Sequence, residues 1–261
     1  MASTQVKVRV QALGGKFLGD DIGGAIVTIR DSQTGQLFAS GTTTGDSGNL
    51  GTSYSPTSSL FTIVTPQKPQ PTIRWLSPDS DASRTSHFSP VIDLTRPTLL
   101  EISASGPVGG LQSAHQVTTR EWFLPAIPPT ELGLVIVIPG LLVQVMQPAT
   151  HSAVTAANSP LTIEANVGMM CGCPINNTEG NPWQPDDFQV LAEFRRVNPP
   201  RPEPVLPPVI LGFAGIASRF RGLAVIPNVA ETAYYELIVV ARQFSTGNIG
   251  TGIVTLIVNP S

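Results

Sequence analysis

The sequence predicts an all-β protein built from two β-sandwich domains, and three observations support this prediction. The length of 261 residues suits two domains of roughly 100 to 150 residues each. The 24 glycines and 25 prolines are spread along the chain, where they penalise long helices and favour short strands joined by turns. Short apolar segments alternate with polar residues at a period of two, which is typical of strands with one buried face.

Composition and charge exclude several classes of protein. Apolar residues make up 41% and charged residues 13%, so the chain is expected to fold compactly. The net charge is -3, and three of the fifteen basic residues are lysines, so we expect no nucleic-acid partner. The strongest apolar stretch, residues 132–146, is interrupted by Pro139 and Gly140 and is too short for a membrane helix of about 20 residues. We expect two strands there and no membrane insertion.

The first domain is expected to contain five strands, at residues 6–10, 25–29, 37–41, 60–64 and 99–104. In the first of them Val6, Val8 and Val10 share one face, so Lys7 and Arg9 are predicted to point away from the core. Residues 31–36 supply a hairpin connection, and residues 45–49 supply a second turn.

The second domain is expected to contain strands at residues 141–146, 161–167, 188–194, 235–241 and 252–258. The boundary is placed at Pro128 and Pro129, because consecutive prolines stiffen a linker, and this gives domains 1–128 and 129–261. A second proline-rich run, from Asn198 to Pro208, is expected to form an exposed polyproline-type loop.

Each half resembles a known family. The segments GAIVTI at 24–29, TGQ at 34–36 and TTTGDSG at 42–48 resemble the pattern of transthyretin-like, carboxypeptidase regulatory-like domains, which implies a non-catalytic sandwich. A Pro/Ser-rich insertion at 54–97 departs from that pattern. The segments YELIVVA at 235–241 and GN at 247–248 are similar to the end of bacterial immunoglobulin-like domains, which implies that Tyr235 packs at the corner of the penultimate strand.

No catalytic set can be assembled from the spacing of the residues. The GDSG at 45–48 matches the sequence around the serine of trypsin-like proteases, but His87, His115 and His151 all follow Ser47, whereas that family places its histidine first. We therefore expect a tight turn at 45–48 and no enzymatic activity.

The two cysteines form the most unusual segment of the chain. On an extended strand Cys171 and Cys173 would share a face with Cβ atoms about 6.5 Å apart, against about 3.8 Å in a disulfide. A bend at Gly172 or Pro174 would permit a local disulfide between them. Buried, inert thiols are the plainer alternative.

A metal site is a third alternative for the same segment. Thiolate and thioether ligands select copper(I), and Cys171, Cys173, Met169 and Met170 would supply them, with His151 as a further candidate. A Cys-x-Cys without a second cysteine pair is otherwise a weak indication of metal binding, so no cofactor is the leading expectation.

Acidic residues and tryptophans complete the set of candidates. Asp20-Asp21, Asp79-Ser80-Asp81 and Asp186-Asp187 lack the spacing of a calcium loop and are expected to be solvated turns. Trp75, Trp122 and Trp183 are expected to be core residues, with a carbohydrate-binding platform as the alternative.

The leading hypothesis is a non-enzymatic structural or interaction protein that binds protein partners or copies of itself, for example as a surface layer or fibre. The alternatives are a periplasmic copper-binding protein and a carbohydrate-binding accessory module. The first residues lack the basic region and apolar run of a signal peptide. With the low lysine content, this favours a mature form of a secreted, periplasmic or cell-surface protein.

Overall fold

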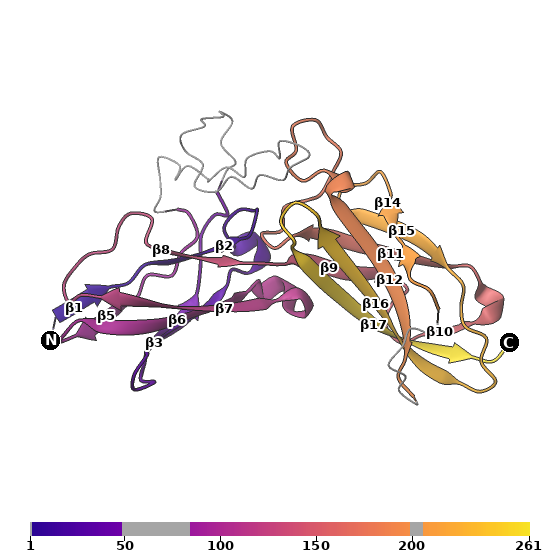
Figure 1. Ribbon diagram of the computed structural model, residues 1–261, viewed down its shortest axis with the longest axis horizontal. Helices are drawn as coiled ribbons and strands as arrows, with labels where there is room; N and C mark the ends of the chain where they lie inside the picture. Colours follow the sequence, from indigo (N-terminus) through magenta and orange to yellow (C-terminus); the bar gives the residue numbers. More distant parts are fainter. Residues whose placement is uncertain (1, 49–83, 199–205) are drawn as a thin grey trace. The chain divides into compact units, whose positions relative to one another are not determined.

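The computed structural model describes residues 2–48, 84–198 and 206–261 and divides into two compact units (Figure 1). The first unit contains residues 1–140 and 170–173, and the second contains residues 141–169 and 174–261. Within the described ranges the regular structure consists of β-strands and short 3-10 turns, which confirms the all-β prediction. No helix in these ranges is long and apolar enough to cross a membrane.

The first unit contains a four-stranded antiparallel sheet with the strand order β4-β3-β6-β7. Predicted segments account for β3 (Ile26–Asp31), β4 (Leu37–Thr42) and β6 (Thr98–Gly106), whereas β7 (His115–Phe123) is an additional strand. The hairpin between β3 and β4 forms as predicted, with Gly35 at φ +74°. The inner face of the sheet is the core of the unit, and its fully buried side chains are Val27, Ile29, Leu100, Ile102 and Ala104.

Four shorter strands face this sheet. Strand β1 (Ala2–Gln5) pairs antiparallel with β5 (Val91–Leu94), and β2 (Val8–Ala12) pairs in parallel with β8 (Leu134–Ile138). Val6, Val8 and Val10 are fully buried, as their alternation predicts. Because β8 pairs with β2, the first unit extends to Gly140, and this division differs from the predicted boundary at 128–129.

Arg9 lies in the core, so the prediction that it points to solvent is wrong. Its side chain is 1% exposed, because β2 is covered on both faces. The guanidinium donates hydrogen bonds to the backbone carbonyl oxygens of Leu132 (3.0 Å), Thr85 (2.5 Å) and Ser86 (3.0 Å). It also lies 5.7 Å from the centre of the Phe17 ring. Apolar alternation cannot distinguish such a buried, hydrogen-bonded arginine from a solvated one.

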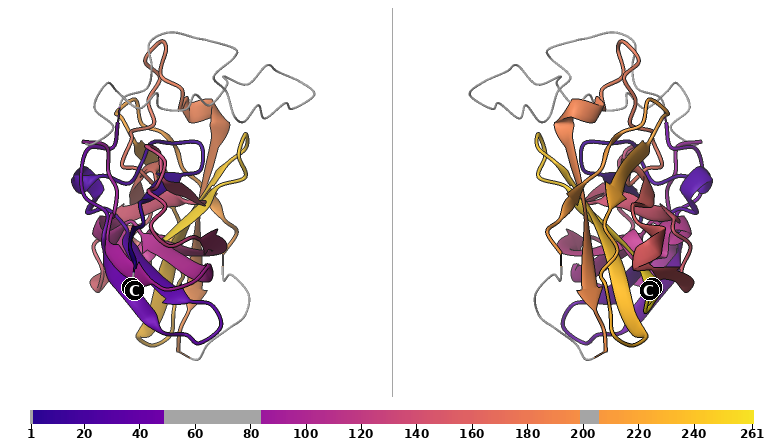
Figure 2. Two further views of the ribbon diagram at one scale, coloured as in Figure 1. Left: turned by 90° about the vertical axis from the view of Figure 1, so that its left-hand side faces the viewer. Right: turned by 90° about the vertical axis from the view of Figure 1, so that its right-hand side faces the viewer.

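The second unit contains a five-stranded sheet with the order β10-β17-β16-β12-β13 and a four-stranded sheet with the order β14-β15-β11-β9. Figure 2 gives two further views of the ribbon. Predicted segments account for β9 (Leu141–Gln147), β11 (Leu161–Met169), β12 (Phe188–Arg196), β16 (Ala233–Gln243) and β17 (Ile249–Asn259). The remaining strands are β10 (Ser152–Thr155), β13 (Val209–Ile210), β14 (Gly212–Phe213) and β15 (Arg219–Ala224).

The two sheets of the second unit approach each other closely along β9 and β17. A Cβ atom on Gly250 would lie 2.1 Å from the carbonyl oxygen of Leu141, and one on Gly252 would lie 2.7 Å from that of Val143. Glycine is therefore required at these two positions of β17. Tyr235 is buried in β16, the penultimate strand, where the resemblance places it.

Several predictions fall outside the described residues. These are the strand at 60–64, most of the insertion at 54–97, Trp75, the acidic residues Asp79 and Asp81, and residues 199–205 of the second proline-rich run.

Candidate functional site

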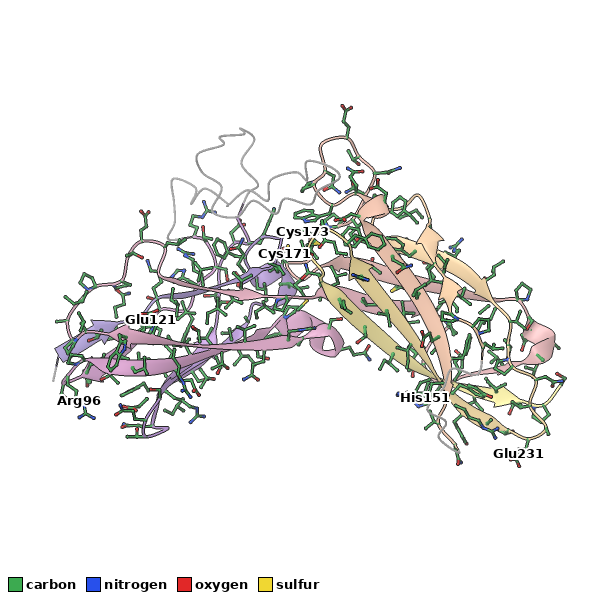
Figure 3. All side chains as sticks on the ribbon, in the orientation of Figure 1. Arg96, Glu121, His151, Cys171, Cys173 and Glu231 are labelled. Carbon is green, nitrogen blue, oxygen red and sulfur yellow. The ribbon has the colours of Figure 1, made fainter. Side chains whose placement is uncertain are left out.

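The two cysteines lie on a tight turn that follows β11. The strand ends at Met169, and the chain reverses through Gly172, which has φ +77°. Gly168 and Pro174 form an isolated antiparallel bridge at the base of this turn. The Sγ atoms of Cys171 and Cys173 are 2.8 Å apart and belong to free thiols (Figure 3). The bend at Gly172 thus brings together two sulfur atoms that an extended strand would hold apart.

The cysteine turn packs within the first unit against a turn of the N-terminal segment. Residues 12–16 form that turn, which is closed by hydrogen bonds from the Ala12 N–H to the Lys16 carbonyl and from the Gly15 N–H to the Ala12 carbonyl, both 2.9 Å. A Cβ atom on Gly15 would lie 3.0 Å from Cys171 Sγ, so the sulfur fills the space that glycine leaves. Cys171 is fully buried and Cys173 is 8% exposed.

The two thiols have different proton affinities. Burial opposes ionisation of Cys171, but its hydrogen bond with the Cys173 thiol, the backbone N–H groups of Lys16 and Cys173, and the Lys16 charge together lower the pKa of Cys171. The same hydrogen bond, burial and the nearby Cys171 charge raise the pKa of Cys173. The first proton of the pair is therefore lost from Cys171, and the second is held more tightly on Cys173.

The remaining residues of the predicted copper site are Met169, Met170 and His151. Met169 and Met170 are fully buried, and His151 lies in the turn before β10 of the second unit. No group of three or more His, Cys, Asp or Glu side chains within the described ranges is placed to hold a metal ion. Two metal–sulfur bonds of about 2.3 Å at a tetrahedral angle would separate the sulfurs by about 3.8 Å. The 2.8 Å between the thiols of Cys171 and Cys173 is shorter than this separation, and copper binding stays a prediction.

The GDSG segment lines a pocket of about 720 Å³ in the first unit. Asp20 Oδ1 accepts a hydrogen bond from the Gly45 N–H (3.0 Å), and Asp46 Oδ1 accepts one from the Gly48 N–H (2.8 Å). His87 also lines this pocket, but its Nδ1 lies 2.8 Å from the Thr85 carbonyl oxygen. These polar groups hold backbone turns in place, which is the role that the sequence predicts for 45–48.

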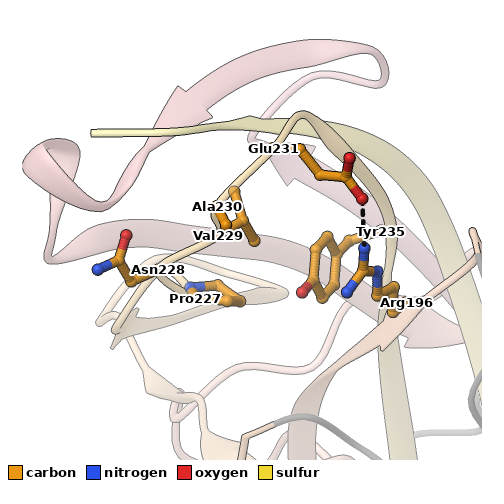
Figure 4. A pocket seen from close by; sticks show the side chains of 7 residues that line it. All are labelled: Arg196, Pro227, Asn228, Val229, Ala230, Glu231 and Tyr235. Carbon is orange, nitrogen blue, oxygen red and sulfur yellow. Dashed lines mark ion pairs between the residues drawn. The ribbon is translucent and has the colours of Figure 1, made fainter.

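A second pocket, of about 390 Å³, lies in the second unit near the end of β12 (Figure 4). Arg196 and Tyr235 line it together with the segment 227–231. The Arg196 guanidinium is 4.0 Å from Glu231 Oε1, and its Nε donates a 2.8 Å hydrogen bond to the Asn198 carbonyl oxygen. The carboxylate of Glu231 is 84% exposed, so this ion pair is weak.

The two described tryptophans have opposite environments. Trp183 is 5% exposed and belongs to the core, so its ring has no accessible face for a sugar. Trp122 on β7 is 59% exposed, contrary to the expectation of a core residue. It lies on the outer face of the four-stranded sheet, opposite Leu99 of β6.

The same outer face bears a row of hydroxyl groups that crosses all four strands. The register aligns Ser40 on β4, Thr28 on β3, Ser103 on β6 and Thr118 on β7. The hydroxyl oxygens of Thr28 and Ser40 are 3.3 Å apart, and those of Ser103 and Thr118 are 2.8 Å apart. The row ends at β7, which among the described strands pairs with β6 alone.

The unpaired side of β7 exposes backbone hydrogen-bonding groups. The carbonyl of Leu99 accepts a hydrogen bond from the Ser32 N–H (3.0 Å) and therefore points away from β7. Its antiparallel partner Trp122 must then direct its own N–H and C=O away from β6. Alternation along the strand gives the same outward direction to the backbone groups of Gln116, Thr118 and Arg120. We call this unpaired side the free edge of β7.

No protein-family model and no curated protein matches the chain. Among solved structures, the chicken interferon gamma receptor alpha chain is similar at 11% identity and a TM-score of 0.31, over 91% of this chain and 85% of that chain. The major pilin subunit BcpA of Bacillus cereus is similar at 8% identity and 0.29, over 99% and 69%. The zebrafish RET cadherin-like domains 1 to 4 follow at 12% identity and 0.20, over 68% and 37%. At these values no function follows from the similarities, and the transthyretin-like family stays a prediction.

Proposed function

We propose that this chain is a non-enzymatic structural protein that associates with copies of itself by adding strands at the free edge of β7. The observation that supports this proposal is a nine-residue edge strand whose even-numbered residues direct their N–H and C=O groups away from β6. Of these groups, the Trp122 N–H is bound by Glu121 Oε1 at 3.2 Å. Such groups bind an added strand through main-chain hydrogen bonds, whatever its side chains.

Strand β7 lacks several of the features with which proteins usually protect an edge, although the Glu121 carboxylate accepts a hydrogen bond from the outward Trp122 N–H. Its register with β6 runs from Thr98–Phe123 to Gly106–His115 without a bulge. The strand contains no proline and no lysine, and the Arg120 guanidinium is engaged by Glu101 of β6 at 2.8 Å. Charge on the strand therefore gives little protection against pairing.

The geometry of the free edge restricts how two copies would pair. Because the outward backbone groups all belong to even-numbered residues, an antiparallel copy must place even-numbered residues opposite one another. The register with Thr118 opposite the other copy's Arg120 avoids two facing arginines, whose like charges would repel. In this arrangement the outer faces of the two sheets, with their rows of hydroxyl groups, form one continuous surface.

The experiment is sedimentation velocity over a concentration series, with Thr118→Pro as the test variant. Proline removes the outward N–H at position 118 and leaves the hydrogen bonds between β6 and β7 intact, so the variant should fold and stay monomeric when the wild type associates. Ser103→Lys is the matched control, since it adds a charge beside Thr118 on the same face but on a central strand. Circular dichroism verifies that both variants fold.

Two results would contradict this function. The first is a wild type that remains monomeric up to millimolar concentration. The second is association of Thr118→Pro at the same concentrations as the wild type, which would move the contact away from the free edge of β7. Turnover of a substrate by the purified chain would contradict the non-enzymatic part.

An exported location is the second part of the proposal. It is supported by the low content of charged residues and the low share of lysine among the basic residues. Fractionation of the native source tests it, and recovery of the chain in the cytosolic fraction alone would contradict it.

A further inference from the structure

We propose that Cys171 and Cys173 form a disulfide that locks the turn between β11 and Pro174 in the conformation seen here. The inference does not depend on association at β7, because it concerns a different segment and a different chemistry. It assigns a modification site to the only two cysteines of the chain.

The distance between the two sulfurs favours a covalent bond over the alternatives. A disulfide requires about 2.05 Å between sulfurs and Cβ atoms about 3.8 Å apart. The observed 2.8 Å lies between a covalent bond and the separation of two unbonded sulfur atoms, and it is shorter than a shared metal allows. A closure of less than 1 Å completes the bond, and rotation of the two side chains is sufficient for this movement.

The local backbone already has the shape that a disulfide between residues two apart requires. An extended strand would hold the two Cβ atoms too far apart, but Gly172 with φ +77° reverses the chain between them. The bridge between Gly168 and Pro174 holds the base of the turn. Gly15 leaves room for Cys171 Sγ, and Ile22 lies 3.7 Å from the position of a Cβ on Gly172.

The oxidant is a small disulfide such as oxidised glutathione. The Cys171 thiolate attacks one of its sulfurs, forms a mixed disulfide and expels one glutathione thiolate, which takes up the proton lost by Cys171. Cys173 then loses its proton to the medium and attacks Cys171 Sγ, which expels the second glutathione thiolate, and this thiolate takes up a proton in turn. Two thiols of the protein are oxidised, one disulfide is reduced to two thiols, and no other co-reactant is needed.

Burial predicts when the bond forms. Cys171 is fully buried and Cys173 is 8% exposed, so a soluble disulfide reaches the Cys171 sulfur in the unfolded chain or during transient opening of the turn. Oxidation should therefore be fast during refolding and slow in the folded, reduced protein.

The experiment is intact-mass spectrometry of the full chain after refolding with a glutathione redox buffer. Alkylation with iodoacetamide under denaturing conditions counts the free thiols. The expected result is a monomer two mass units lighter than the reduced chain that takes up no alkyl group, and that takes up two after reduction. Cys171→Ser and Cys173→Ser are the controls, and each should take up one alkyl group. A parallel arm adds copper(I) to the reduced chain under native conditions.

Three outcomes would overturn the proposal. These are two alkylated cysteines at equilibrium in the oxidising buffer, a covalent dimer instead of the lighter monomer, and a reduced chain that retains stoichiometric copper(I) through Cys171 and Cys173. The mass is measured on the denatured chain, so a failure of association at β7 cannot produce any of these three outcomes.

Discussion

The Arg9 guanidinium donates a 2.5 Å hydrogen bond to the backbone carbonyl of Thr85, in the interior of the first unit. It also binds the carbonyls of Ser86 and Leu132, so one side chain joins three segments that are distant in the sequence. Burial lowers the pKa of Arg9, against the charge of Glu131, but the guanidinium stays protonated at neutral pH.

Replacement of Arg9 by methionine should be strongly destabilising. Arg9→Met fills the space but leaves buried carbonyl oxygens without their donors, so we expect the free energy of unfolding to fall by about 3 kcal/mol. Urea denaturation measures this change. Arg30→Met is the control, since Arg30 is exposed on β3, and it should change stability by less than about 0.5 kcal/mol. Equal effects of the two substitutions would refute a structural role for Arg9.

Asp187 should stabilise the turn between β16 and β17. Its carboxylate accepts hydrogen bonds from the Ser245 N–H (2.9 Å), the Ser245 hydroxyl (2.5 Å) and Gln243 Nε2 (2.9 Å). Asp187→Ala removes the acceptor of a buried Gln243 side chain and should cost about 2 kcal/mol, measured by thermal and urea unfolding. The exposed neighbour Asp186 is the control, and Asp186→Ala should have little effect.

Glu164 should make the stability of the second unit depend on acidity. The hydrogen bond from Arg221 lowers the pKa of Glu164 below its ordinary value of 4.5 against partial burial, and the charges of Arg221 and Arg219 lower it further. The unfolded chain therefore binds this proton more readily than the folded one. The stabilising contribution is present above the unfolded pKa near 4.5 and is lost as the pH falls through the folded pKa.

The test is the melting temperature of Glu164→Gln between pH 7 and pH 3. The variant should be less stable than the wild type at pH 7, and the difference should shrink below pH 4.5. Glu179→Gln, at an exposed turn position, is the control and should follow the wild-type curve. A difference that stays constant down to pH 3 would refute the linkage.

Gly250 should not tolerate a side chain. A Cβ atom there would meet the Leu141 carbonyl oxygen at 2.1 Å, so Gly250→Ala forces β9 and β17 apart. We expect a loss of about 2 to 3 kcal/mol in the free energy of unfolding. Gly212 on β14 has no atom within 4 Å of its Cβ position, so Gly212→Ala provides the matched control with a change near zero. Chemical denaturation of both variants decides the matter.

The sequence predicts strands well where one face is buried and the other is wet. Residues 188–194 and 235–241 alternate clearly, and they form β12 and β16. Apolar alternation does not reveal strand β7, because an edge strand exposes much of both faces. Its sequence HQVTTREWF lacks a continuous apolar side. The burial of Arg9 is missed for the opposite reason, since β2 is buried on both faces.

The candidate sites were harder to predict than the strands. The sequence identifies Cys171 and Cys173 and indicates that a bend at Gly172 would bring them together, but the sulfur separation depends on the turn itself. Parallel pairing of β2 with β8 has no local signature, so the sequence could not show that residues 134–138 close the first unit.

The parallel pairing of Val8 with Leu134 has a consequence for synthesis of the chain on the ribosome. At roughly 5 to 20 residues per second, β2 emerges roughly 6 to 26 seconds before β8 is available to cover it. Throughout that interval the nascent polypeptide has a hydrophobic N-terminal segment without its partner. Ribosome-bound fragments that stop short of residue 134 should therefore require chaperones, whereas fragments extended well past residue 173 should fold their N-terminal half unaided.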